Sequence, residues 1–162
     1  MSGPKKTLED LKKEYHVLMK KYPLPSFEEL NANFSIERVV DIETDFLLRE
    51  IRKCVGDKLF NYLRFVENLL NPINASMFIF SLIKSLGPEE KRKLSEVYKK
   101  LSVLEIKFIK LDLSFNEEKE VEFIKEANKE WCSIRDNFKD ILERIEGNLD
   151  NKSDIQGKGY LG

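Results

Sequence analysis

Three acidic side chains are the residues of this chain whose positions could support chemistry. Glu105, Asp112 and Glu120 fall within the apolar stripes of the helices predicted below, and Asp112 and Glu120 flank the same turn. An inward carboxylate is costly unless it is paired with a base or bound to a cation. A carboxylate-based metal-binding bundle or enzyme is therefore one hypothesis, although the sequence lacks the Glu-x-x-His pairs of di-metal bundles. Pairing with Lys or Arg, or exposure near a helix end, is the alternative.

The other reactive side chains do not form a catalytic or ligand-binding pattern. His16 is the only histidine, and neither Cys54 nor Cys132 has a histidine within sequence reach. The sequence also lacks phosphate-binding loops, serine-nucleophile motifs and zinc-protease motifs. We therefore assign no catalytic residue, no metal ligand and no cofactor. Two cysteines, with no secretory segment before the first helix, favour a reducing, cytoplasmic setting.

Charge and composition narrow the partners that we expect. The chain has 28 Lys and Arg against 29 Asp and Glu, so its net charge is -1. Nucleic acid binding needs a clustered positive surface, so nucleic acid is not expected as a direct ligand. Attachment to a ribonucleoprotein through protein contacts stays an alternative. A membrane-spanning helix needs about 20 apolar residues. The densest apolar stretch, 71–88, is shorter and contains Lys84, so no membrane association is expected.

Apolar residues recur at spacings of three and four along almost the whole chain, and no stretch alternates like a strand. This periodicity predicts helices over about 7–22, 26–33, 38–70, 73–86, 88–113 and 117–146. The connections are short, which favours antiparallel neighbours. We therefore expect an all-α antiparallel helical bundle of about five or six helices, with residues 1–147 as one domain. Residues 148–162 are polar and glycine-rich, and they predict a short flexible C-terminal tail.

Capping signals mark where several of these helices begin and end. Capping-box sequences open at Thr7, Ser26 and Ser114, where a side-chain oxygen can accept from an unpaired backbone N–H of the first turn. Glycine is the usual residue just past a helix end. We therefore expect the 73–86 helix to end at Gly87 and the last helix to end at Gly147.

The predicted helix over 73–86 is apolar on both sides. One side is expected to be core, and it carries Ala75, Phe78, Ile79, Leu82, Ile83 and Leu86. The other side carries Ile73, Met77 and Phe80. Since helices that are apolar all round are usually interior, coverage by residues 27–34 is one interpretation. A contact surface for a partner is the other.

Helix lengths predict that the turn between the 88–113 and 117–146 helices projects from the bundle. At 1.5 Å per residue, the 88–113 helix outruns the 73–86 helix by roughly 18 Å. The projecting end would expose apolar side chains rimmed by acidic ones, which is the usual mark of a protein contact. The residues that we assign as protein-binding there are Phe108, Leu111, Leu113, Phe115 and Phe123. A steep crossing of the 73–86 helix, or coverage by the first helix, is the alternative.

A second predicted contact lies at the C-terminus. Tyr160 and Leu161 have the character of apolar anchors in a short docking peptide whose glycines give it reach; a solvated end is the alternative. Together these features predict a non-enzymatic helical protein-interaction module. Such a module would be a subunit, adaptor or regulatory factor of a larger intracellular assembly. It would bind a protein partner or associate with itself.

Overall fold

The computed structural model describes residues 5–161, with side chains described as far as residue 150. Every regular element in this part of the chain is a helix, and six of them are α-helices. In chain order they are α1 (Leu8–Lys21), α2 (Phe27–Phe34), the 3-10 helix η1 (Ile36–Asp41), α3 (Leu47–Leu70), α4 (Met77–Lys84), α5 (Pro88–Leu113) and α6 (Glu117–Leu161). The predicted all-α bundle is confirmed.

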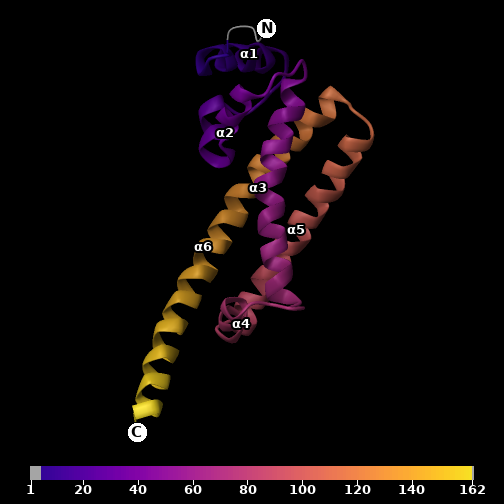
Figure 1. The fold of residues 1–162 in the computed structure, drawn as a ribbon. Coiled ribbons are helices and arrows are strands. Elements are labelled where there is room, and N and C mark those ends of the chain that lie inside the picture. The colour runs from indigo at the N-terminus through magenta and orange to yellow at the C-terminus, as the bar shows by residue number, and fades with distance from the viewer. Residues whose placement is uncertain (1–4, 162) are drawn as a thin grey trace.

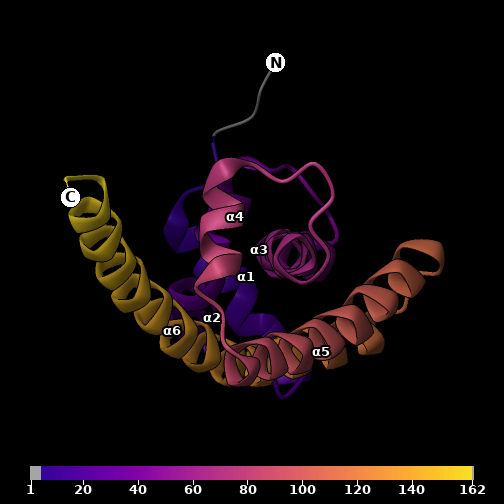
Figure 2. The ribbon, with the colours of Figure 1, turned by 90° about the horizontal axis from the view of Figure 1, so that it is seen from below.

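Three long helices form the body of the molecule. α3 and α5 run in opposite directions, and α6 returns alongside them (Figure 1). Figure 2 shows α5 and α6 as a curved layer with α3 against its concave side. Each of the three helices turns a stripe of branched apolar side chains toward the other two, as expected for a packed bundle. Their fully buried members include Val55, Leu59, Leu101, Ile124 and Ile134.

The N-terminal segment forms a second layer over one end of this body. α1 buries Leu11 and Tyr15, and the Tyr15 hydroxyl donates to the carbonyl of Pro25 at 2.5 Å. The Phe27 ring of α2 meets the Tyr15 ring edge-on, with 5.7 Å between the centroids. α2 is held to α6 by an amide hydrogen bond of 2.9 Å from Asn33 to Asn128. The two prolines between α1 and α2 therefore lie in a turn that is fixed by side chains on both sides.

Two of the three predicted capping sites are confirmed. Thr7 caps α1 in a reciprocal box with Asp10, and the Ser26 hydroxyl accepts from the Glu29 N–H at 3.1 Å. The third site is wrong, because α6 begins two residues later than Ser114 allows. Asn116 is the cap there, and its side-chain oxygen accepts from the backbone N–H three residues on, at 3.1 Å.

The predicted helix over 38–70 is wrong in its first part. The chain forms η1 over Ile36–Asp41 and an irregular connection, and α3 begins only at Leu47. In the connection, the backbone N–H of Phe46 donates to the Thr44 hydroxyl at 2.9 Å. This local side-chain contact competes with helix formation. Spacings of three and four are shared by 3-10 and α-helices, so periodicity does not separate them.

α4 is shorter than predicted and is placed differently. In Figure 2, α3 is seen end-on while α4 is seen lengthwise, so α4 crosses the end of α3 steeply. Because α4 crosses the end of α3 and does not run back along it, α5 lies antiparallel to α3 over the full length of α3. The α5–α6 turn then lies level with the start of α3 (Figure 1) and does not project from the bundle. The element that extends past its neighbours is α6.

Residues 27–34 do not cover α4. α2 packs near α1, at the opposite end of the bundle from α4 (Figure 1). The buried side chains of α2 pack on other parts of the chain. The ring centroids of Phe34 and Trp131, for example, lie 6.0 Å apart. The interpretation in which α4 is interior is therefore wrong, and its outer face is exposed.

The backbone of α6 continues as helix past Gly147 to Leu161, whereas the sequence predicts a stop at Gly147. No glycine of the described chain has a positive φ, so the left-handed helix-ending conformation is not used there. Just beyond Gly147, the Asn148 side chain donates to the Ser85 carbonyl at 2.9 Å, which fixes this stretch of α6 against the end of α4. The expected flexibility of residues 148–162 stays a prediction. The side chains of Tyr160 and Leu161 lie outside the described residues.

Candidate protein-binding site

The inward carboxylates meet at a buried arginine. Arg52 of α3 points between α5 and α6, where its Nε lies 2.5 Å from Glu120 Oε2 and its Nη1 lies 3.1 Å from Asp112 Oδ1. Arg52 and Glu120 are fully buried, and the guanidinium lies 4.5 Å from the centre of the Phe108 ring. Asp112 and Glu120 therefore share one layer, as the sequence suggests. What links them is an arginine.

Burial dominates the electrostatics of this cluster. It raises the pKa of the Glu120 carboxyl above its ordinary value, while Arg52 acts in the opposite direction. Glu120 Oε1 and Arg52 Nη2 have no hydrogen-bond partner within the described part of the chain. The third carboxylate, Glu105, pairs with Arg64 on the protein surface. Among the described residues, no group of three His, Cys, Asp or Glu side chains could hold a metal ion.

Sequence reasoning missed Arg52, although a signal for it exists. Ile51, Val55 and Leu59 mark the buried side of α3, and Arg52 falls on the same side. An arginine within an apolar stripe is buried only when a counter-charge is available. Matching it with the inward Glu120 would have predicted this ion pair.

The five residues predicted as a contact surface at the α5–α6 turn divide into two groups. Phe123 and Leu111 are buried in the core, with Phe123 only 2% exposed, and Phe108 is half-buried against Phe123 with 5.9 Å between ring centroids. Leu113 is 82% exposed, and Phe115 is also exposed. The Phe115 ring packs on the exposed ring of Phe46, with 5.3 Å between the ring centroids. The turn therefore carries a small apolar surface and not the continuous patch that the sequence predicts.

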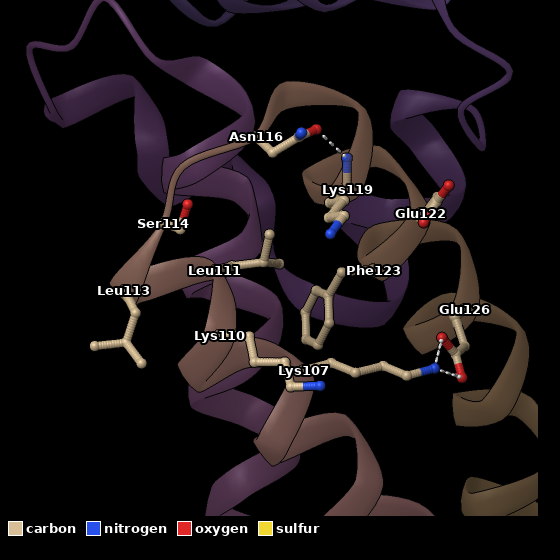
Figure 3. Close-up of a pocket in the computed structure, with 10 residues that line it drawn as sticks. All are labelled: Lys107, Lys110, Leu111, Leu113, Ser114, Asn116, Lys119, Glu122, Phe123 and Glu126. Carbon is tan, nitrogen blue, oxygen red and sulfur yellow. Dashed lines mark hydrogen bonds and ion pairs between the residues drawn. The ribbon is translucent and has the colours of Figure 1, made fainter.

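A groove lies beside this turn, between the last residues of α5 and the first of α6 (Figure 3). Its volume is about 490 Å³. Leu111 and the ring of Phe123 form its apolar floor, since both side chains line it although they are otherwise buried. Its remaining lining residues are Lys107, Lys110, Leu113, Ser114, Asn116, Lys119, Glu122 and Glu126.

The rim of the groove carries three lysines and two glutamates, Glu122 and Glu126. Lys107 is paired with Glu126 at 2.6 Å. The side-chain ammonium groups of Lys110 and Lys119 have no ion-pair or hydrogen-bond partner among the residues that the structure describes. In Figure 3, the Lys119 side chain extends toward the Phe123 ring from one helix, and Lys110 approaches from the other. This arrangement can bind an acidic group that lies next to an apolar side chain.

The remaining candidate residues stand apart from this groove. His16 is exposed on α1. Cys54 and Cys132 are free thiols; Cys54 is buried, and this burial raises the pKa of its thiol. A raised thiol pKa lowers the thiolate fraction and with it the reactivity. Cys54 is therefore a packing residue.

The fold and this groove define the class of the protein: an all-α bundle with a lysine-rimmed apolar groove at one inter-helix turn. In comparisons with known proteins, no family model, no curated protein and no solved structure matches the chain. Of the helices that the structure describes, none combines the length and the apolar character needed to cross a membrane.

Proposed function

We propose that this chain is a non-enzymatic helical protein-interaction module that binds an acidic, apolar segment of a partner protein. The observation that supports this function is the groove at the α5–α6 turn. Its floor of Leu111 and Phe123 is apolar, and Lys110 and Lys119 on its rim have no counter-ion among the described side chains. A subunit, adaptor or regulatory factor of an intracellular assembly would use such a site.

The physical argument rests on complementarity of both charge and surface. A partner carboxylate between the two ammonium groups would gain two ion pairs, which set orientation and association rate. An adjacent apolar side chain would fill the floor and displace water, which supplies most of the affinity. The exposed side chains of Leu113 and Phe115 extend the apolar surface beyond the groove. A short helix or extended segment could lie across all of these groups.

No observation favours the two alternative functions over this one. The carboxylates that suggested a metal-binding or enzymatic bundle are engaged by Arg52 and Arg64. A ribonucleoprotein-associated factor would still act through protein contacts, and the groove would serve that role as well. The free thiols of Cys54 and Cys132 support a reducing compartment such as the cytoplasm.

The test is a charge reversal on the groove with a matched control. The variant Lys110→Glu with Lys119→Glu should fold normally, because both lysines are exposed. The control is Lys99→Glu with Lys139→Glu, which makes the same charge change at exposed positions on the same two helices. Partners captured by the wild-type chain from native extract are identified by mass spectrometry, and the purified partner is then titrated against each variant.

We expect the groove variant to lose at least about tenfold in affinity, since two interfacial ion pairs become repulsive. The control variant should bind like the wild type. Binding should also weaken with salt, because the ion pairs are screened. Equal affinity of the two variants would exclude the groove as the contact, and a wild-type chain that captures no protein would exclude the function.

A further inference from the structure

The outer face of α4 is an exposed surface of large apolar side chains. Met77 is 88% exposed, and Phe78 and Phe80 are 64% and 47% exposed. Ile73, in the connection between α3 and α4, is 70% exposed and extends the apolar surface beyond the helix. The sequence predicts Phe78 as core, which is wrong. Because α4 lies across the end of the bundle (Figure 2), this face points away from the body of the protein.

The α4 face can be covered by a partner without burying a charge or an unpaired hydroxyl group. Residues 71–83 contain no charged side chain, in a chain of which 35% is charged. The polar residue on the exposed side of the helix is Ser81, whose hydroxyl donates to the carbonyl of Met77 at 3.0 Å. That donor is satisfied inside the helix, so covering it costs little. Lys84 marks the edge of the face, and it has an interaction of its own in the structure.

We infer that the α4 face binds a second copy of this chain in a two-fold symmetric pair. In such a pair the same patch meets itself, so each side must be complementary to its own copy. A neutral apolar face satisfies this condition, whereas a face with charges of one sign would repel itself. Around the helix, Ser81 lies between Met77 and Phe80 on one side and Phe78 on the other. Its small side chain lets two helices approach closely while the larger side chains interlock.

The area of the α4 face also supports a second copy of the chain as its partner. Since a large side chain offers on the order of 150–200 Å², the exposed fractions of the four apolar residues sum to roughly 500 Å² per protomer. Two copies would bury at most about 1,000 Å² in total, which reaches the lower limit for a specific interface. Pairing would also stabilise α4 itself, because an isolated helix of eight residues is marginal in water.

Self-association would not compete with the groove. α4 lies at one end of the body and the α5–α6 turn at the other (Figure 1). A pair joined through α4 would carry two open grooves facing away from each other. It would therefore bind bivalently to a partner that presents two acidic segments at the matching distance.

The first test measures oligomeric state. Sedimentation equilibrium of the full chain should show a monomer–dimer equilibrium with a dissociation constant in the micromolar range. Met77→Asp with Phe78→Asp should weaken dimerisation at least tenfold and leave the helical circular dichroism unchanged. The control, Val103→Asp with Ile106→Asp, alters two exposed apolar residues of α5 and should leave dimerisation unchanged. A wild-type chain that stays monomeric, or a dimer that is unaffected by the α4 variant, overturns the inference.

The second test locates the contact. Ser81→Cys in a Cys132→Ser background should form a disulfide-linked dimer on mild oxidation, because Ser81 of each copy lies near the two-fold axis. The matched control places the cysteine at Ser95, which is exposed on α5. Linkage of the Ser81→Cys chain at no greater rate than the Ser95→Cys chain would overturn the symmetric pairing. The wild-type chain could instead be monomeric and capture another protein that the α4 variant no longer captures. That result would overturn the pairing and assign the α4 face to the captured protein.

Discussion

At the scale of single residues, the Arg52 side chain joins the two helices of the α5–α6 hairpin. Its two carboxylate partners come from the end of α5 and the start of α6, and Phe108 stacks on its face. Because the pKa of Glu120 is raised by burial, protonation of this carboxyl favours the folded state. Stability contributed by Glu120 therefore does not fall as the pH drops, and Glu120 is not a source of acid unfolding.

The buried pair predicts strong non-additivity on substitution. Arg52→Met should reduce the free energy of unfolding by about 3–5 kcal/mol, because Glu120 then stays buried without a counter-charge. Arg52→Met combined with Glu120→Leu should recover most of that loss, since both desolvation costs are removed. Urea unfolding of both variants and of Glu120→Leu alone would measure the coupling. Additive losses would show that the two side chains do not act as a pair.

Because the Tyr15 hydroxyl is buried, we expect the free energy of unfolding to depend on pH in the alkaline range. Burial, together with the carboxylates of Glu28 and Glu29, raises the pKa of its hydroxyl well above the ordinary value of 10.0. Above about pH 10 the unfolded chain loses this proton while the folded chain keeps it, so stability falls as the pH rises. Tyr15→Phe should cost about 1 kcal/mol at neutral pH through the lost hydrogen bond to Pro25. Its stability should then decline less steeply than that of the wild type above pH 10, and a parallel decline would refute this role.

At the scale of elements, the sequence predicts which segments are helical better than where they end. Periodicity and caps locate α1, α2 and α5 to within a residue or two, because Thr7, Ser26 and Pro88 act locally. The break between η1 and α3 depends on a hydroxyl contact from Thr44 that spacing does not reveal. The burial of Phe123 and Leu111 depends on how α4 crosses, which is set by tertiary packing. The sequence therefore predicts an exposed contact surface at the α5–α6 turn, and it does not predict the groove, its shape or its charge.

Gly147 provides a test of the continuity of α6. A Cβ built at Gly147 has no atom within 4 Å, and glycine in a helix interior costs about 0.5–1 kcal/mol relative to alanine. Gly147→Ala should therefore stabilise the chain by that amount if α6 is continuous. If the helix instead ended there in a left-handed conformation, as the sequence predicts, the same change would destabilise it.

Gly56 is the matched contrast within α3. A Cβ added there would overlap the ring of Phe108, which is itself fixed by Arg52 and by an edge-on contact with Phe60 at 5.0 Å. Gly56→Ala should lower the free energy of unfolding by about 1–3 kcal/mol, despite the higher helix propensity of alanine. Thermal or urea unfolding of both glycine variants would check the opposite signs. A stabilised Gly56→Ala chain would mean that the Phe108 ring is free to move.

At the scale of the whole molecule, an aromatic cluster around Trp131 joins the two layers. Trp131 of α6 contacts the Phe34 ring of α2 at 6.0 Å and the Tyr62 ring of α3 at 5.4 Å. Lys58 lies 4.8 Å from the centre of the indole and donates to the carbonyl of Asn33. The apolar stripe of the last predicted helix places Trp131 in the core, and its burial confirms this. That Trp131 also links α2 to the body could not be inferred, because the stripe gives a face and not a partner.

This junction predicts that the N-terminal layer and the helical body unfold together. Trp131→Ala should cost about 3–5 kcal/mol, the usual range for a buried large aromatic side chain. Phe115→Ala, which truncates an exposed ring, should cost less than about 1 kcal/mol. Trp131 is the only tryptophan, so its fluorescence reports the junction while circular dichroism reports total helix. In the wild-type chain the two signals should follow a single urea transition with a common midpoint. A fluorescence transition that precedes the loss of helix would show that α2 detaches first, and that the layers are stable independently of each other.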